Sequence, residues 1–202
     1  MTTRYAQIET LVHRFKPSHI VEVGVHRALR AVVMCAAALR HRRKVYYTGF
    51  DVFETMDSAF HEAALNGKGI ATQRDADIRL SKLAACAYPA KLLHVFIVGD
   101  TRVTLHGDPV EADFAFIDGD HRVDVIRGDA AAIKAPVLVF DDYYRPGPDG
   151  RCPDLQRYGA NAVVHELEAA GARVEILPAA DLCKHGGLAH LALVERAPKG
   201  TA

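Results

Sequence analysis

The sequence predicts an α/β protein built on a doubly wound, mainly parallel sheet of seven strands. Short apolar, β-branched runs alternate with longer helical patterns, as expected for a parallel sheet whose two faces are covered by helices. The last two apolar runs are separated only by a polar, glycine-containing loop, which predicts an antiparallel hairpin at the edge of the sheet. With 202 residues, 50% of them hydrophobic, we expect one domain over 1–202.

The order of elements follows from hydrophobic periodicity. Apolar residues recur at helical spacing from Tyr5 to Phe15 before Pro17 stops the pattern, so 1–17 is expected to form an N-terminal helix. At the other end, 197–202 is expected to be a frayed tail. The expected strands are 19–23, 45–50, 92–98, 113–117, 137–140, 173–177 and 188–194, and the expected helices between them are 28–40, 75–88, 121–133 and 159–170.

Composition excludes several classes of partner. Lys+Arg and Asp+Glu are both 25, so no net charge draws the chain to nucleic acid or to an anionic membrane. No apolar stretch approaches a membrane span, and the first residues lack the pattern of a signal peptide. The four cysteines are far apart and form no C-x-x-C pair, so neither a zinc knuckle nor a disulfide framework is predicted. We therefore expect a cytoplasmic protein that acts on a small molecule.

The end of the first strand carries the first candidate binding residues. Glu22 and Gly24 close a buried strand that turns through His26 into a helix, so backbone N–H groups and a helix N-terminus face the strand end. Such a turn can hold the carboxylate of a ligand. A structural turn with one glycine would look similar.

The second candidate is Asp51, followed by Val52, at the end of the second strand. Asp51 comes 27 positions after Gly24. An acid at this place can accept both ribose hydroxyls of a nucleoside, as in dinucleotide-binding folds. The alternative is that Asp51 only caps a turn.

Two acidic motifs, FIDGDH (116–121) and VFDDYY (139–144), each follow a buried strand. If the two strands are adjacent, Asp118, Asp141 and Asp142 lie within reach of one ion and could hold Mg²⁺. Without a cation, three crowded carboxylates would raise one another's pKa. The structural alternatives are a helix cap at Asp120 and a turn at Asp141 and Asp142.

Two neighbouring residues compete for the role of general base. His121, with an ordinary pKa near 6.5, could remove a proton close to neutral pH, and Asp120 lies beside it. We favour His121 narrowly over Asp120.

These motifs together resemble those of class I S-adenosylmethionine (SAM) dependent methyltransferases, which have a Rossmann-like fold. The run VEVGVHRALRA resembles their motif I, with Ala28 in place of its second glycine and Arg30 in place of its hydroxyl residue. The segments IDGDH and DDY resemble the macrocin O-methyltransferase and cephalosporin-hydroxylase-like group over roughly 20–144, and GFDVFE (49–54) resembles a D-x-F-E segment of related O-methyltransferases.

The resemblance implies a divalent-metal-dependent O-methyltransferase. SAM would bind at Glu22, Gly24, His26, Asp51, Val52, Asp100, Thr101 and Asp118, with Asp100 toward the adenine. A hydroxyl of a small molecule or sugar-containing metabolite would coordinate the metal and be methylated. A non-catalytic SAM-binding module and a hydroxylase-like enzyme stay open as alternatives. The acceptor is not specified, although the segments expected to line it contain Phe60, His61, Tyr144, Arg145 and Tyr158. A homo-oligomer is compatible with the sequence.

Overall fold

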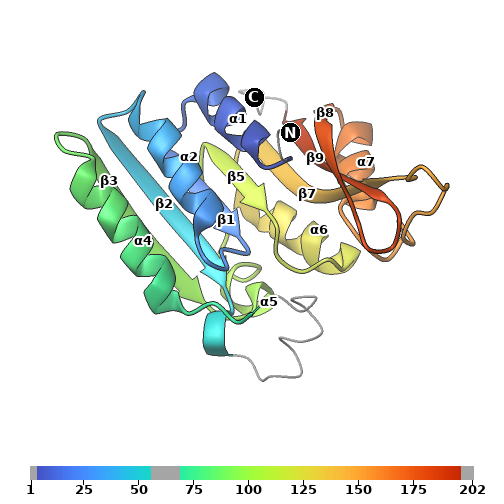
Figure 1. Ribbon diagram of the computed structural model, residues 1–202, viewed down its shortest axis with the longest axis horizontal. Helices are drawn as coiled ribbons and strands as arrows, with labels where there is room; N and C mark the ends of the chain where they lie inside the picture. Colours follow the sequence, from blue (N-terminus) through green and yellow to red (C-terminus); the bar gives the residue numbers. More distant parts are fainter. Residues whose placement is uncertain (1–3, 56–68, 197–202) are drawn as a thin grey trace.

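The computed structural model describes residues 4–55 and 69–196 (Figure 1). Its main sheet has seven strands in the order β3-β2-β1-β5-β7-β9-β8. The pairs from β3 to β7 are parallel, and β9 is antiparallel to both β7 and β8. The strands are β1 His19–Val23, β2 Lys44–Asp51, β3 Lys91–Val98, β5 Phe114–Ile117, β7 Val137–Arg145, β8 Arg173–Leu182 and β9 Leu188–Glu195. The predicted fold class and its terminal hairpin are confirmed.

Helices cover both faces of this sheet (Figure 1). One buried cluster joins the apolar side of α1 (Ala6–Phe15), α2 (Leu29–Leu39) and α4 (Gln73–Cys86) to one face of the strands. A second cluster joins α6 (Val123–Ala132) and α7 (Asn161–Ala169) to the opposite face. Alternate strand residues point to alternate faces, so Phe114 and Phe116 lie in the first cluster while Ala115 and Ile117 lie in the second.

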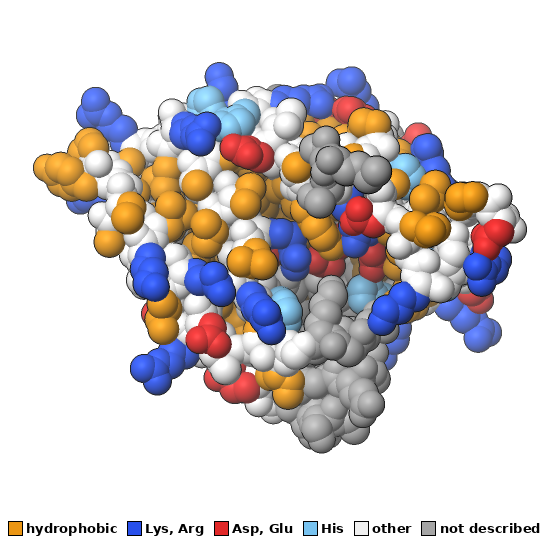
Figure 2. All heavy atoms as spheres, viewed as in Figure 1, with side chains coloured by type: hydrophobic (Ala, Val, Ile, Leu, Met, Phe, Trp, Pro, Cys, Tyr) orange, Lys and Arg blue, Asp and Glu red, His pale blue; other side chains and the backbone are white. Residues whose placement is uncertain are grey.

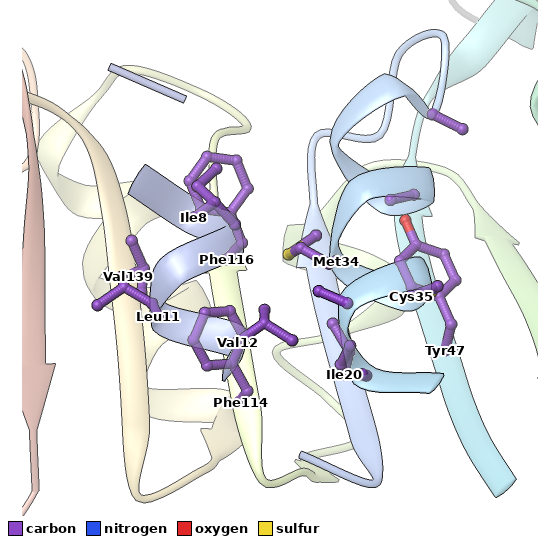
Figure 3. Packing of buried hydrophobic residues seen from close by; sticks show 14 of the residues in the cluster. Ile8, Leu11, Val12, Ile20, Met34, Cys35, Tyr47, Phe114, Phe116 and Val139 are labelled. Atoms are coloured by element: carbon purple, nitrogen blue, oxygen red, sulfur yellow. The ribbon is translucent and has the colours of Figure 1, made fainter. Parts of the chain in front are cut away.

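Helix α1 shows how the sequence directs this packing. Ile8, Leu11 and Val12 recur at helical spacing and are buried against residues of the sheet (Figure 3). Burial of such a side chain contributes about 1.5–3 kcal/mol. The helix ends at Lys16, whose left-handed conformation lets its N–H donate to the Val12 carbonyl at 2.8 Å, and Pro17 prevents continuation. At the other end of α1, the contacts of Arg4 with Asp141 and Asp142 hold the segment before the helix against β7.

Several boundaries differ from the sequence-based expectation. Strand β7 runs on to Arg145, although the residues from Tyr143 were expected to be irregular, because β9 continues to pair with it as far as Leu188. Helix α6 begins at Val123 rather than at residue 121. Short elements appear that were not predicted: η1 (Phe53–Thr55), α5 (Thr101–Thr104) and the two-residue strands β4 (Val110–Glu111) and β6 (Ile133–Lys134).

Some expectations lie outside the described residues, namely the frayed tail at 197–202 and the positions of Phe60 and His61. Over the ranges 4–55 and 69–196, no helix is both long enough and apolar enough to cross a membrane.

Candidate functional site

A cavity of about 600 Å³ lies at the carboxyl ends of β1, β2, β5 and β7. This volume is in the range of small-molecule sites, and the position is where open α/β sheets bind ligands. In Figure 2, basic, acidic and histidine side chains gather toward the middle of the face shown. The predicted site residues that line the cavity are Gly24, His26, Asp51, Val52, Asp100, Thr101, Asp118, Asp120, His121, Asp141 and Asp142. Only Glu22 is absent from this lining.

The turn after β1 depends on Gly24. Its φ is +85°, and a Cβ atom there would overlap the carbonyl of Asp118 at the end of β5. A glycine is therefore required both by conformation and by the close approach of two strand ends. Ala28, at the second glycine position of the motif, also adopts a left-handed conformation, with φ 55° and ψ 24°, and precedes α2 directly. A non-glycine residue thus adopts the left-handed conformation at this position.

Asp51 ties this turn to the end of β2. One carboxylate oxygen accepts the backbone N–H of His26 at 2.7 Å, and the other accepts that of Phe53 at 2.6 Å. A carboxylate oxygen can accept more than one hydrogen bond, so Asp51 keeps acceptor capacity toward the cavity. The arrangement holds its carboxylate in a fixed direction.

Glu22 lies behind the cavity, fully buried. The Tyr47 hydroxyl donates to it at 2.5 Å, and the Arg30 guanidinium lies 3.7 Å away. Burial raises the pKa of Glu22 to about 7, although the Arg30 charge and the Tyr47 hydrogen bond oppose the shift. Glu22 therefore contacts Tyr47 and Arg30 inside the protein and does not line the cavity.

Asp100 faces the cavity rim but is paired within its own segment. Its carboxylate accepts the backbone N–H of Arg102 at 2.9 Å, Arg102 Nε at 3.0 Å on each oxygen, and Arg102 Nη2 on Oδ2. These hydrogen bonds are the main reason that the pKa of Asp100 lies below its ordinary value. A contact from Asp100 to an adenine would share the carboxylate with Arg102.

Asp141 and Asp142 reach the cavity together because β7 is irregular. Successive residues of a regular strand point to opposite faces, yet both carboxylates are here on one side. The β7–β9 register shifts between Phe140 and Tyr143, and Asp142 has a φ of 55°. This β-bulge aims both side chains at the site, so neither the predicted turn nor a regular strand end describes them.

The three carboxylates predicted to hold Mg²⁺ contact arginines instead. Arg30 Nη2 lies 2.8 Å from Asp118. Arg4 Nη2 lies 3.2 Å from Asp141 Oδ2, and Arg4 Nη1 lies 3.3 Å from Asp142 Oδ1. Within the described parts of the chain, no group of three or more His, Cys, Asp or Glu residues has the arrangement of a metal site. The predicted metal centre is therefore not supported by this geometry.

His121 and Asp142 form the pair best suited to acid–base chemistry. His121 Nδ1 lies 2.6 Å from Asp142 Oδ2. Burial lowers the pKa of His121, but the hydrogen bond and charge of Asp142 outweigh it and hold the pKa above its ordinary value. Burial opposes ionisation of Asp142, yet the bond from His121 and the nearby charges bring its pKa down to about 2. Asp142 thus stays ionised and orients the imidazole.

Asp120, the competing candidate base, is engaged elsewhere. It accepts the backbone N–H of Arg122 at 2.7 Å and the Arg122 guanidinium at 2.7–3.1 Å. Burial raises its pKa, but these bonds outweigh burial and leave the pKa below its ordinary value. The geometry favours His121 over Asp120. Asp120 is not the N-cap of α6 either, since Arg122 occupies that position.

Sequence reasoning missed some of the residues that complete the cavity. Arg4 and Tyr5 reach it from the N-terminal segment, and the end of β8 with the β8–β9 turn contributes the run 181–185. Tyr158, which was expected near the acceptor, lines the cavity and stacks on His121 with ring centroids 5.2 Å apart. Tyr144 was also expected near the acceptor, and its ring centroid lies 5.9 Å from that of Tyr158. The N-terminal residues carried no signal, because they lie more than 130 positions from the carboxylates that they contact.

Comparisons with known proteins give the fold a context. The sequence matches no family model and no curated protein. Solved structures do match. The O-methyltransferase TomG from Streptomyces achromogenes, involved in tomaymycin synthesis and solved with SAM, is 16% identical over 96% of this chain and 80% of its own, with a TM-score of 0.57.

Two further structures are similar. An O-methyltransferase from Bacillus cereus in complex with SAH is 16% identical, with a TM-score of 0.54 over 96% of this chain and 80% of its own. Cofactor-bound Rv0187 from MTB is 16% identical, with a TM-score of 0.60 over 95% and 78%. Likeness at this level of identity establishes a shared fold, which is that of O-methyltransferases solved with SAM or SAH.

Proposed function

We propose that this protein is a SAM-dependent O-methyltransferase that acts on a hydroxyl group of a small molecule. The observation that carries the proposal is the partly buried His121–Asp142 pair at 2.6 Å, placed in the same cavity as the Gly24 turn and Asp51. One end of the cavity thus has the features of a nucleoside site and the other has an oriented base. The O-methyltransferases of the same fold support the assignment.

The residues present fit SAM. Gly24 lines the cavity and lets the ends of β1 and β5 approach closely, and the start of α2 follows its turn, as in sites that bind a ligand carboxylate. Asp51 is held with acceptor capacity toward the cavity, where ribose hydroxyls would bind. SAM, when bound, supplies an electrophilic methyl group.

The chain's own part in the reaction is to place the acceptor and take its proton. His121 would accept the hydroxyl proton at Nε2, since its Nδ1 faces Asp142. Tyr144, Tyr158 and the β8–β9 turn would exclude water and bound the acceptor. A methyl transfer needs little covalent help from the protein, so positioning should supply most of the rate enhancement.

The Mg²⁺ implied by the sequence motifs does not fit this arrangement. Magnesium requires near-octahedral oxygen ligands, whereas Asp118, Asp141 and Asp142 are each engaged by an arginine. We therefore assign no step to a metal. A hydroxylase with two histidines and one carboxylate around iron finds no support in the described residues either.

Transfer of a labelled methyl group tests the proposal. The protein is incubated with trideuteromethyl-SAM and a panel of catechols, phenols, polyols and sugars, and products are identified by mass spectrometry. We expect an acceptor to gain a deuterated methyl group on oxygen, and His121→Gln to lower the rate by roughly 10²- to 10⁴-fold without loss of SAM binding. Tight SAM binding without transfer to any acceptor would favour the non-catalytic module, and absence of SAM binding would contradict both.

A further inference from the structure

A pair of arginines and a tyrosine surround the acidic cluster Asp118, Asp141 and Asp142. Arg30 Nη2 contacts Asp118 Oδ2 at 2.8 Å, and Arg4 spans the other two carboxylates through Nη2 at 3.2 Å and Nη1 at 3.3 Å. The side chains of Arg4 and Arg30 are only 11% and 19% exposed. These ion pairs are therefore shielded from water and from screening by salt.

Tyr5 joins the two arginines. Its ring centroid lies 4.8 Å from the Arg4 guanidinium and 5.0 Å from that of Arg30, within cation–π distance of both. Its hydroxyl donates to Asp141 Oδ2 at 2.7 Å and accepts from Arg4 Nη2 at 2.8 Å. We call Arg4, Tyr5 and Arg30 the arginine clamp. It is built from the two residues that precede α1 and from the first turn of α2, so it is part of the fold.

The clamp supplies positive charge to the acidic cluster without balancing it fully, since burial and the charges of Asp141 and Asp142 raise the pKa of Asp118 despite Arg30. The two guanidinium groups are permanently protonated, but Arg4 Nε also pairs with Asp181 at 3.3 Å and Arg30 Nε lies 3.7 Å from Glu22. His121 adds a third positive charge when it is protonated. A divalent cation placed among the same carboxylates would repel both guanidinium groups at short range in a buried setting. Oδ2 of Asp118, Oδ2 of Asp141 and both oxygens of Asp142 are already engaged.

We propose that the arginine clamp takes the place of a divalent cation in this site and holds Asp142 in the position from which it orients His121. This inference rests on the proposed function and deepens it, because the acceptor hydroxyl is then activated by His121 alone and methyl transfer needs no metal. Arg30, which occupies the hydroxyl position of the methyltransferase motif, makes the contact to Asp118. Arg4 and Arg30 are positioning residues in this account.

Metal binding and thermal unfolding, measured without SAM or acceptor, test the clamp. Mn²⁺ is titrated into the protein and followed by electron paramagnetic resonance, for wild type and for Arg4→Met, which removes the charge and keeps an apolar side chain of some length. We expect no stoichiometric Mn²⁺ binding by wild type and no change of its Tm on adding EDTA or Mg²⁺. Arg4→Met should gain a Mn²⁺ site and lose at least about 6 °C in Tm, because it leaves buried carboxylates unpaired.

Arg127→Met is the matched control. Arg127 pairs with Glu166 at 2.7 Å, but both side chains are about half exposed, so the Tm should change by at most about 4 °C and no Mn²⁺ site should appear. Arg30→Met, which frees Asp118, provides a second test if Arg4→Met does not fold. Stoichiometric Mn²⁺ binding by wild type, lost in Asp141→Asn, would overturn the proposal, as would an unchanged Tm in both clamp variants. Neither result depends on SAM binding, so failure of the clamp and failure of the methyltransferase assignment can be told apart.

Discussion

Replacing Asp142 with asparagine removes the charge from the partner of His121 while nearly preserving its size. The bond from His121 Nδ1 to Asp142 is 2.6 Å long and joins groups that are both largely buried. A hydrogen bond to a charged group contributes about 1.5–3 kcal/mol, and one pKa unit corresponds to about 1.4 kcal/mol. Asp142→Asn should therefore lower the pKa of His121, because it removes the largest effect that opposes burial and leaves only the charges of Asp141 and Asp120 to favour protonation.

The direction of the pH effect follows from this shift. In wild type the raised pKa keeps His121 protonated to a pH above its ordinary value near 6.5, so the rate should rise as pH increases through that raised pKa. In Asp142→Asn this limb should move to lower pH. The maximum rate should nevertheless fall by roughly 10²- to 10⁴-fold, because asparagine no longer holds the imidazole in the productive orientation and tautomer.

Nuclear magnetic resonance titration of the histidine rings measures the pKa without any acceptor, with the His121 signal assigned by comparison with His121→Gln. Formation of SAH against pH gives the rate profile. The matched control is Asp77→Asn, which removes a carboxylate 2.8 Å from His94, away from the cavity, and should leave the His121 titration unchanged. A His121 pKa that is unchanged or higher in Asp142→Asn would refute the proposed pairing.

Two further substitutions test the geometry around this pair. Gly24→Ala should destabilise the fold by about 1–3 kcal/mol or more in urea unfolding, since its Cβ overlaps the Asp118 carbonyl at a φ of +85°; an unchanged stability would mean that the strand ends are not so close. Asp120→Asn should keep the wild-type pH profile, because its carboxylate is occupied by Arg122. A pH-dependent loss larger than that of His121→Gln would instead identify Asp120 as the base.

The sequence predicted the features that depend on local pattern. Alternating strands and helices indicated the doubly wound sheet, and the lack of a helical pattern before β9 indicated the antiparallel hairpin. Gly24 and Asp51 were predicted at strand ends because a glycine turn and an acid at those places have a recognisable spacing, and both line the cavity. Parallel strands bring their carboxyl ends to one edge, so order along the chain was enough.

Features that depend on distant contacts could not be predicted in the same way. Two adjacent aspartates gave no sign of a bulge in β7, since the bulge is a property of its pairing with β9. Arg4 looked like an ordinary residue ahead of a surface helix, yet it contacts Asp141 and Asp142 across the fold. The metal hypothesis identified three carboxylates that do lie together, but no pattern in the sequence indicated that Arg4 contacts two of them.

The assignment of the cavity as a SAM site is tested most directly by calorimetric titration of SAM into wild type and Asp51→Ala. We predict saturable binding of one SAM per chain by wild type in the presence of EDTA. Asp51→Ala should bind about tenfold more weakly or worse, since a carboxylate bonded to ribose hydroxyls contributes roughly 1.5–3 kcal/mol. Asp149→Ala, which changes an exposed acid paired with Arg151, should bind SAM like wild type. Absence of SAM binding by wild type, or unchanged affinity in a folded Asp51→Ala, would contradict the account.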